Sequence, residues 1–304
     1  MKNSFSDANP FTKLIFSLFI ILVSFLITFI IGLIVAIPLF HIGFSELSTV
    51  LSDYNNPNNI IFLKYLQTLQ AIGLFIIPAF IIGYLFSNSA TSYLCFKRKI
   101  SANALILTIF IFLISIPIIS YLGVLNSNMQ LPEWLSGVEV WMKEKEESAK
   151  LITTAFLRMD SVGSLLFNLF MIGALPAIGE ELIFRGVFQK IIGDWAKNMH
   201  VGILVSAFIF SAMHFQFYGF FPRFILGVLL GYLFYWSGSI WVPILGHFVN
   251  NSVAIITYFF YADEALEGLE SIGQETVAFV GISMAIVSAS LFAFYKESRR
   301  LVKS

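Results

Sequence analysis

Eight apolar stretches, each long enough to cross a lipid bilayer, constrain this chain more than any other feature of its 304 residues. A transmembrane helix needs about 20 consecutive, mostly apolar residues. Only 12% of the residues are charged, whereas roughly a quarter are charged in soluble domains. The sequence therefore predicts an all-α fold, a polytopic transmembrane helical bundle with about eight spans, at residues 14–40, 60–86, 103–125, 161–179, 200–217, 221–237, 239–261 and 275–295.

The distribution of basic residues predicts how these spans are oriented, because Lys and Arg collect on cytoplasmic loops. If the first span starts inside, eleven Lys and Arg residues lie on the inner side and six on the outer side. Both termini are then cytoplasmic, and the acidic segment 262–274 lies outside. The net charge is zero, which leaves no basic surplus for nucleic acid. We expect an integral protein of a bacterial plasma membrane, surrounded by the lipid bilayer and without a nucleic-acid partner.

We expect the whole chain, residues 1–304, to form one membrane domain. The spans within residues 1–125 carry no diagnostic residues and are interpreted as accessory. Residues 126–160 form the one long polar connection, on the outer side. Trp134 and Trp141 are seven residues apart and so share one face of a possible helix in this connection. That helix lies either at the membrane interface or in solvent.

Polar side chains inside the expected spans form three clusters. Ionisable groups are expensive in hydrocarbon, so such residues are functional candidates by default. A helical rise of about 1.5 Å per residue places the clusters between roughly 12 and 21 Å from the inner boundary, where three helices can surround one cavity. The clusters are Glu180, Glu181 and Arg185, into which the fourth span runs, Phe210 and His214 in the fifth span, and His247 and Asn251 in the seventh.

The spacing within each cluster predicts which side chains meet. Glu180 and Glu181 are adjacent, so they point about 100° apart on a helix. Glu181 and Arg185 have i,i+4 spacing, which suits a carboxylate–guanidinium pair. Glu180 then remains as the reactive carboxylate. His247 and Asn251 have the same spacing and would present two polar groups side by side.

These residue types fit hydrolysis by an activated water. A carboxylate such as Glu180 suits a general base, and a facing imidazole can position the water. A second His with an Asn amide can stabilise the oxyanion of a tetrahedral intermediate. The same groups could instead form a zinc site of the His₂Glu type. Pro176 has no backbone N–H and is expected to bend the helix beside Glu180.

Taken together, the three motifs resemble those of the CAAX protease and bacteriocin-processing (CPBP, or Abi) family of intramembrane endopeptidases, which includes the type II CAAX prenyl endopeptidases. The resemblance rests on Glu180-Glu181-xxx-Arg185, Phe210-xxx-His214 and His247-xxx-Asn251, in this order and in successive spans. It extends to the Glu-Leu-Ile-Phe-Arg-Gly run at 181–186 and to the Gly-Ser-Ile-Trp-x-Pro run at 238–243. It covers about residues 160–255, the expected catalytic core.

The resemblance implies a role for each motif residue. Glu180 and His214 would activate the water, and His247 and Asn251 would form the oxyanion site. Supporting roles fall to Glu181, Arg185 and Phe210. We favour a mechanism that requires no cofactor, because Asn251 beside His247 suits hydrogen-bond donation. The alternative is Zn²⁺ held by Glu180, His214 and His247.

The sequence is compatible with three classes of function. The favoured one is an intramembrane endopeptidase that hydrolyses a peptide or protein substrate arriving from the cytoplasmic side. The second is a non-proteolytic membrane scaffold for bacteriocin immunity or secretion. The third is a proton- or ion-coupled transporter, for which the sequence shows no inverted repeat.

Overall fold

The chain folds into a bundle of long helices in the computed structural model, which describes residues 2–43, 46–261 and 277–303. The expected acidic segment 262–274 therefore lies outside the described residues. In chain order the α-helices are α1 Pro10–Phe40, α2 Leu47–Ser52, α3 Pro57–Ala71, α4 Ile77–Phe86, α5 Ala90–Tyr93, α6 Ala102–Ile114, α7 Ile116–Ser127, α8 Ser136–Leu157, α9 Val162–Asn168, α10 Leu175–Ile183, α11 Gln189–Ala196, α12 Met199–Ala212, α13 Phe220–Ser237, α14 Trp241–Tyr261 and α16 Val277–Lys303. Short π-helical turns (η2 Ile72–Ile76, η4 Leu169–Ala174, η5 Phe184–Phe188) and 3₁₀ turns (η3 Glu133–Leu135, η6 Phe217–Gly219) connect some of them. The all-α expectation is confirmed.

Seven helical segments in the described part of the chain are long and apolar enough to cross a membrane. They are Pro10–Phe40, Pro57–Phe86, Ala102–Ser127, Val162–Ala196, Phe217–Ser237, Trp241–Tyr261 and Ala278–Arg300. The remaining expected span corresponds to α12, an apolar helix of only 14 residues. The protein is therefore an integral membrane protein.

Two expected spans have different ends in the structure. The fourth was placed at residues 161–179, but the helical segment runs on to Ala196 and carries the whole first motif in its middle. The fifth was placed at residues 200–217, but α12 ends at Ala212, so His214 lies in the turn that follows. The fourth end was placed too early, because polar residues that find buried partners lower the hydropathy of a helix without ending it. The fifth end was placed too late, because apolar residues continue beyond the end of α12.

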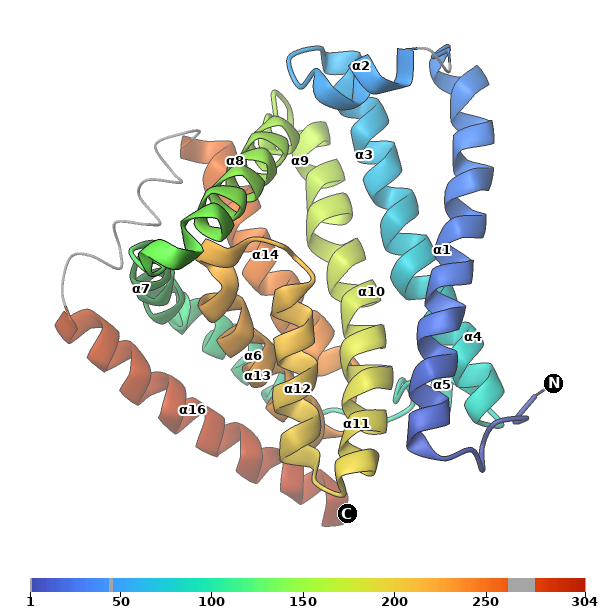
Figure 1. Ribbon diagram of the computed structural model, residues 1–304. Coiled ribbons are helices and arrows are strands. Elements are labelled where there is room, and N and C mark those ends of the chain that lie inside the picture. The colour runs from blue at the N-terminus through green and yellow to red at the C-terminus, as the bar shows by residue number, and fades with distance from the viewer. Residues whose placement is uncertain (1, 44–45, 262–276, 304) are drawn as a thin grey trace.

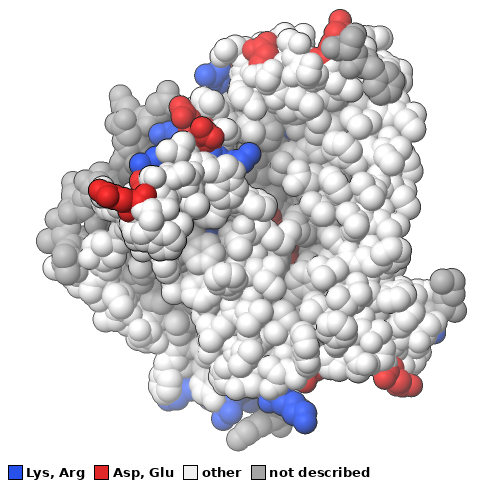
Figure 2. All heavy atoms as spheres, viewed as in Figure 1, with Lys and Arg blue, Asp and Glu red and all other residues white. Residues whose placement is uncertain are grey.

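Helix α8 lies across one end of the bundle, and the turn between α11 and α12 lies at the other end (Figure 1). The beginning of α1 and the end of α16 are on the α11–α12 side as well. Lys and Arg dominate this end in Figure 2, whereas acidic and basic side chains are mixed around α8. The structure thus carries more basic side chains at one end than at the other, and which end faces the cytoplasm stays a prediction.

The helical segment that carries the first motif is not a regular α-helix. Helix α10 is preceded by the π-turn η4 and followed by the π-turn η5. Pro176 lies in the first turn of α10, directly after η4, where its missing N–H interrupts the α-helical ladder. Single π-turns inside helices occur frequently at functional sites. The irregularity expected at Pro176 is present, and it takes the form of this π-turn.

A large apolar core holds the C-terminal half of the helical segment Val162–Ala196 in place. Leu182, Ile183 and Val187 are almost fully buried in a cluster that also includes residues of α1, α4 and α12. Glu180 lies at the edge of this core.

Close packing of α11 against α12 depends on Gly202. A Cβ atom on Gly202 would lie 2.5 Å from the Gln189 carbonyl oxygen and 2.8 Å from Gly193 Cα, both of which are backbone atoms. We expect Gly202→Ala to lower the free energy of unfolding by about 1–3 kcal/mol, because the two backbones must separate. The measurement is the unfolding midpoint in detergent micelles. The matched control is Gly281→Ala on α16, where a Cβ would meet nothing within 4 Å. An equal effect of both substitutions would contradict this explanation.

Candidate active site

The expected pair between Glu181 and Arg185 is present and is completely buried. Arg185 Nη1 donates to Glu181 Oε1 at 2.8 Å, and the exposed fractions of the two side chains are 1% and 0%. His247 Nδ1 lies 2.8 Å from the same Oε1 atom. A carboxylate oxygen accepts hydrogen bonds, so Nδ1 is the protonated ring nitrogen here. One carboxylate therefore fixes both the guanidinium and the tautomer and orientation of the imidazole.

Arg185 and Gln189 also anchor this segment to α13. Arg185 Nη2 donates to the Gly227 carbonyl at 2.9 Å, and Gln189 Nε2 donates to the Gly231 carbonyl at 3.1 Å. The two donors are four residues apart on one helical segment, and the two acceptors are four residues apart on α13. Two parallel hydrogen bonds therefore join the helices. Gly227 also lets α13 approach α12, since a Cβ there would lie 3.0 Å from Ala207 Cβ. Gly227 and Gly231 thus serve in helix packing and also supply two carbonyl acceptors.

Phe210 packs against the groups of all three motifs. The Arg185 guanidinium carbon lies 4.9 Å from the centre of its ring, and the His214 and His247 rings lie 5.1 and 5.8 Å away. The Phe210 carbonyl oxygen is 2.8 Å from His214 Nδ1. Because a carbonyl can only accept, His214 Nδ1 carries the proton, and Nε2 is the nitrogen with the lone pair in neutral His214. This arrangement suits an imidazole that accepts a proton or a water hydrogen at Nε2.

Glu180 faces away from the Glu181–Arg185 pair, as the helical spacing predicts. Its Oε2 atom is buried and has no hydrogen-bond partner in the described part of the chain. Among the described residues, the basic side chain within ion-pair distance of Glu180 is His247, whose Nε2 lies 3.9 Å from Glu180 Oε2. That distance is too long for a direct hydrogen bond. The ring of His247 therefore lies between two carboxylates and hydrogen-bonds only the deeper one, Glu181.

Asn251 contacts the irregular part of the motif helix. Its Nδ2 atom donates to the Ile172 carbonyl oxygen at 3.3 Å. Ile172 is four residues before Pro176, so its carbonyl cannot receive the usual α-helical N–H bond. Asn251 supplies a donor in its place. Asn250 donates in turn to Asn251 Oδ1 at 3.3 Å.

A cavity of about 380 Å³, here called the central cavity, brings two of the predicted catalytic residues together. Figure 2 shows the molecule hollowed beside α8, with acidic atoms visible in the depth. Amide side chains of Gln67, Gln70 and Gln216 add polar groups to an otherwise apolar wall. The residues that line the cavity are Gln67, Gln70, Ala71, Leu74, Phe75, Ala149, Ile152, Thr153, Phe156, Met171, Ile172, Pro176, Glu180, Phe184, Phe210, Met213, His214 and Gln216.

Helix α8 forms one wall of the central cavity through Ala149, Ile152, Thr153 and Phe156. The long polar connection is thus a helix that packs beside the candidate site. Its position also bears on the expected direction of substrate entry. A substrate that enters beside α8 comes from the cytoplasm only if α8 lies on the cytoplasmic side of the membrane. The basic residues predict the opposite, with α8 on the outer side.

The residues do not fit a metal site. Among the described residues, no three His, Cys, Asp or Glu side chains are close enough together to hold one ion. His214 and His247 each use Nδ1 in a hydrogen bond, which leaves only Nε2 of each ring for a metal, and Glu181 is bound by Arg185. A zinc ion on Glu180, His214 and His247 would therefore need a rearrangement of these side chains.

Sequence reasoning predicted the members of the three motifs but missed several contacts between them. The structure brings Glu180 and His214 to the central cavity and places His247 against both glutamates. Asn251 lies on the η4 side and is not among the residues that line the cavity. The link from His247 to Glu181 and the two carbonyl acceptors on α13 were not anticipated. The amides of Gln67 and Gln70, three residues apart in an apolar span, were the one available signal for further cavity residues.

Residues 162–253 match the family model described as "Type II CAAX prenyl endopeptidase Rce1-like". This part of the chain is similar to that family. The match covers the two π-turns, all three motifs and α14 as far as the residues just beyond Asn251. The expected resemblance to CAAX-type proteases is thereby confirmed for the region in which it was expected.

Two curated relatives of the chain come from Bacillus subtilis (strain 168). The uncharacterized protein YpbD is 34% identical over 83 residues, which is 26% of this chain and 39% of that relative. The sporulation-killing factor biosynthesis protein SkfC is 37% identical over 86 residues, which is 26% of this chain and 17% of that relative. The similarity thus spans well under half the length of either relative. No solved structure matches the chain.

Proposed function

We propose that this protein is an intramembrane endopeptidase that hydrolyses a peptide bond in the central cavity. Glu180 accepts a proton from a water molecule that His214 positions through Nε2. The water oxygen attacks the carbonyl carbon of the peptide, and the carbonyl oxygen becomes the oxyanion. Glu180 then returns the proton to the departing amine nitrogen as the C–N bond breaks. Atoms and protons balance without a further reactant.

His247 is the oxyanion donor in this proposal. Its ring is held by Glu181 through Nδ1, so that a protonated His247 presents Nε2–H on the side of Glu180. The Asn251 amide nitrogen carries a second hydrogen besides the one given to Ile172, and we assign this hydrogen to the oxyanion as well. Neither His247 nor Asn251 is among the residues that line the central cavity, so this assignment requires both side chains to reach the oxyanion from behind the cavity wall. Arg185 and Phe210 act indirectly, since they keep Glu181 and the two imidazoles in place.

One observation supports this proposal more than any other. The fully buried Glu181 is paired with Arg185, while its neighbour Glu180 has a buried oxygen without a hydrogen-bond partner at the wall of a cavity. Two adjacent carboxylates in such different environments are typical of sites where one is structural and the other reactive. A non-proteolytic scaffold would have no need for this difference.

The substrate class follows from the surroundings of the site. An apolar cavity with a few amide groups suits an extended peptide or a segment of a membrane protein that enters beside α8. One relative is named for the biosynthesis of a sporulation-killing factor. We therefore propose maturation of a peptide or small membrane protein, in a bacterial plasma membrane.

Incubation of the purified full chain in lipid nanodiscs with a peptide library tests the proposal. Mass spectrometry in ¹⁸O-labelled water should find cleaved products with one heavy oxygen at each new carboxyl terminus. Glu180→Ala and His214→Ala should abolish them. No cleavage by the intact protein would leave the scaffold as the better explanation. Full activity of both variants would show that the cleavage does not depend on Glu180 and His214.

Chelators are expected to change the cleavage rate less than twofold, because the proposed water activation uses only protein groups. The measurement is the rate before and after incubation with 1,10-phenanthroline, with a zinc-dependent protease as the positive control. Loss of activity that zinc restores would contradict the metal-free mechanism and leave the proteolytic function itself intact.

A further inference from the structure

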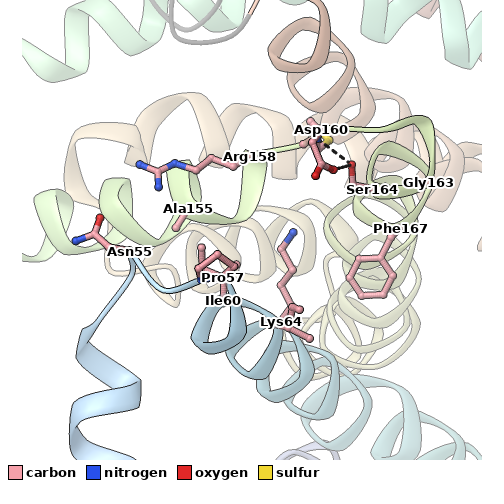
Figure 3. A pocket seen from close by; sticks show the side chains of 12 residues that line it. Asn55, Pro57, Ile60, Lys64, Ala155, Arg158, Asp160, Gly163, Ser164 and Phe167 are labelled. Carbon is pink, nitrogen blue, oxygen red and sulfur yellow. Dashed lines mark hydrogen bonds between the residues drawn. The ribbon is translucent and has the colours of Figure 1, made fainter. Parts of the chain in front are cut away.

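A second cavity, distinct from the central one, lies where α3, α8 and α9 meet. We call it the Lys64 pocket (Figure 3). It has a volume of about 720 Å³. Its lining residues are Asn55, Pro57, Ile60, Ile61, Lys64, Ala155, Arg158, Met159, Asp160, Gly163, Ser164 and Phe167. None of them belongs to the three motifs.

Lys64 is an unusual residue for such a place. Its exposed fraction is only 8%, and its Nζ donates to Asn168 Oδ1 at 2.9 Å, a neutral acceptor. In the described part of the chain no Asp or Glu oxygen lies within ion-pair distance of this ammonium. A buried charge without a counter-charge is costly. Figure 3 shows the amine reaching into the pocket, so an anion bound there would supply the missing counter-charge.

The charges that line the pocket favour a singly charged anion. Arg158 provides a second cation, while Asp160 is the one carboxylate in the lining. Asp160 Oδ1 accepts a hydrogen bond from Ser164 Oγ at 3.2 Å. The lining therefore has one surplus positive charge, which matches a phosphate diester. Ammonium and guanidinium groups are the usual partners of phosphate oxygens.

The position of the pocket along the spans places it at the level of lipid headgroups. The span Pro57–Phe86 has 30 residues and is about 45 Å long, which is close to the full thickness of a bilayer with its headgroups. Lys64 is seven residues from the start of this span, and long basic side chains extend toward the interface. Pro57 and Gly163, at the first turns of two spans, line the same pocket. The cations thus lie at the depth where phosphate groups are found.

The apolar part of the lining continues onto the surface that faces lipid. Ile61 and Phe167 line the pocket and have exposed fractions of 57% and 48%. Acyl chains can follow these side chains while a headgroup occupies the polar end. We propose that the Lys64 pocket binds one phospholipid, with its phosphate held between the Lys64 ammonium and the Arg158 guanidinium.

Binding of defined lipids to the delipidated full chain, followed by native mass spectrometry, tests this proposal. Dioleoylphosphatidylglycerol should bind at one site with higher affinity than dioleoylphosphatidylcholine, which carries no net charge. Lys64→Gln and Arg158→Gln should each weaken this binding at least about tenfold, the scale of one charge-assisted hydrogen bond. Arg158 is exposed, so Arg158→Gln should not disturb the fold. It therefore still tests the proposal if Lys64→Gln prevents folding.

The control is Lys145→Gln on the exposed face of α8, which should leave lipid binding unchanged. Unchanged affinity in both pocket variants would overturn the proposal. Displacement of the lipid by millimolar inorganic phosphate, or by a peptide with a free carboxyl terminus, would overturn the lipid as occupant and assign the pocket to that anion.

Discussion

Replacing Glu180 with Gln is expected to lower the rate constant of peptide cleavage by about 10²–10⁴-fold, the usual contribution of a general base. The amide keeps the size of the side chain but cannot accept a proton from water. The loss should fall on kcat, since the proposed role begins only after the substrate is bound. The fold should be unaffected, because Glu180 Oε2 makes no hydrogen bond that the substitution could remove.

A single-turnover assay in nanodiscs, with the unfolding midpoint measured in parallel, checks this prediction. The matched control is Glu144→Gln, the same chemical change on the exposed side of α8. It should leave both quantities as they are. A Glu180→Gln variant that cleaves within tenfold of the parent rate would show that Glu180 is not the base, even if the protein is a protease.

The parts of this site that the sequence predicts are those that depend on local geometry. The Glu181–Arg185 pair follows from i,i+4 spacing. The different directions of the Glu180 and Glu181 side chains follow from the rotation of about 100° per residue along a helix. The existence of the spans follows from apolar length. These features require only the period of a helix.

Other parts depend on which helices become neighbours, and a single sequence does not specify this. The His247–Glu181 contact joins residues 66 positions apart, and the Arg185–Gly227 contact joins residues 42 positions apart. The expected end of the fourth span at residue 179 was wrong for the same reason: Glu181, Arg185 and Gln189 look unfavourable in a membrane until their partners on other helices are known. The central cavity and the Lys64 pocket likewise depend on where α8 packs.

The buried network around Glu181 should be important for stability as well as for catalysis. Glu181→Met removes the carboxylate and leaves the Arg185 guanidinium buried without a counter-charge. Loss of one partner from a buried ion pair typically costs about 3–5 kcal/mol, and we expect a decrease of this size in the free energy of unfolding. His247 would lose the acceptor for Nδ1 at the same time, so cleavage should also fall.

A double variant separates the charge effect from the loss of contacts. Glu181→Met with Arg185→Met removes both charges and should be more stable than Glu181→Met alone, since well-packed apolar groups can replace a buried ion pair at little or no cost. Its activity should remain low, because His247 is still without its acceptor. The measurements are unfolding in mixed micelles and cleavage in nanodiscs for the parent and the three variants of this cycle.

A pair of the same spacing at the surface serves as the control, with the Lys143 side chain exposed and the Glu139 side chain 17% exposed. Lys143 and Glu139 are also four residues apart and 2.7 Å from each other, but the exposed fraction of the Lys143 side chain is 63%. The hydrogen bond from Lys143 lowers the pKa of the Glu139 carboxyl, yet solvent screens the interaction. Glu139→Met should therefore change stability little. If it destabilises the protein as much as Glu181→Met does, burial is not what makes the Glu181–Arg185 pair important. If Glu181→Met alone has no effect, Arg185 must find another counter-charge, and Glu180 is the nearest candidate on its own helix.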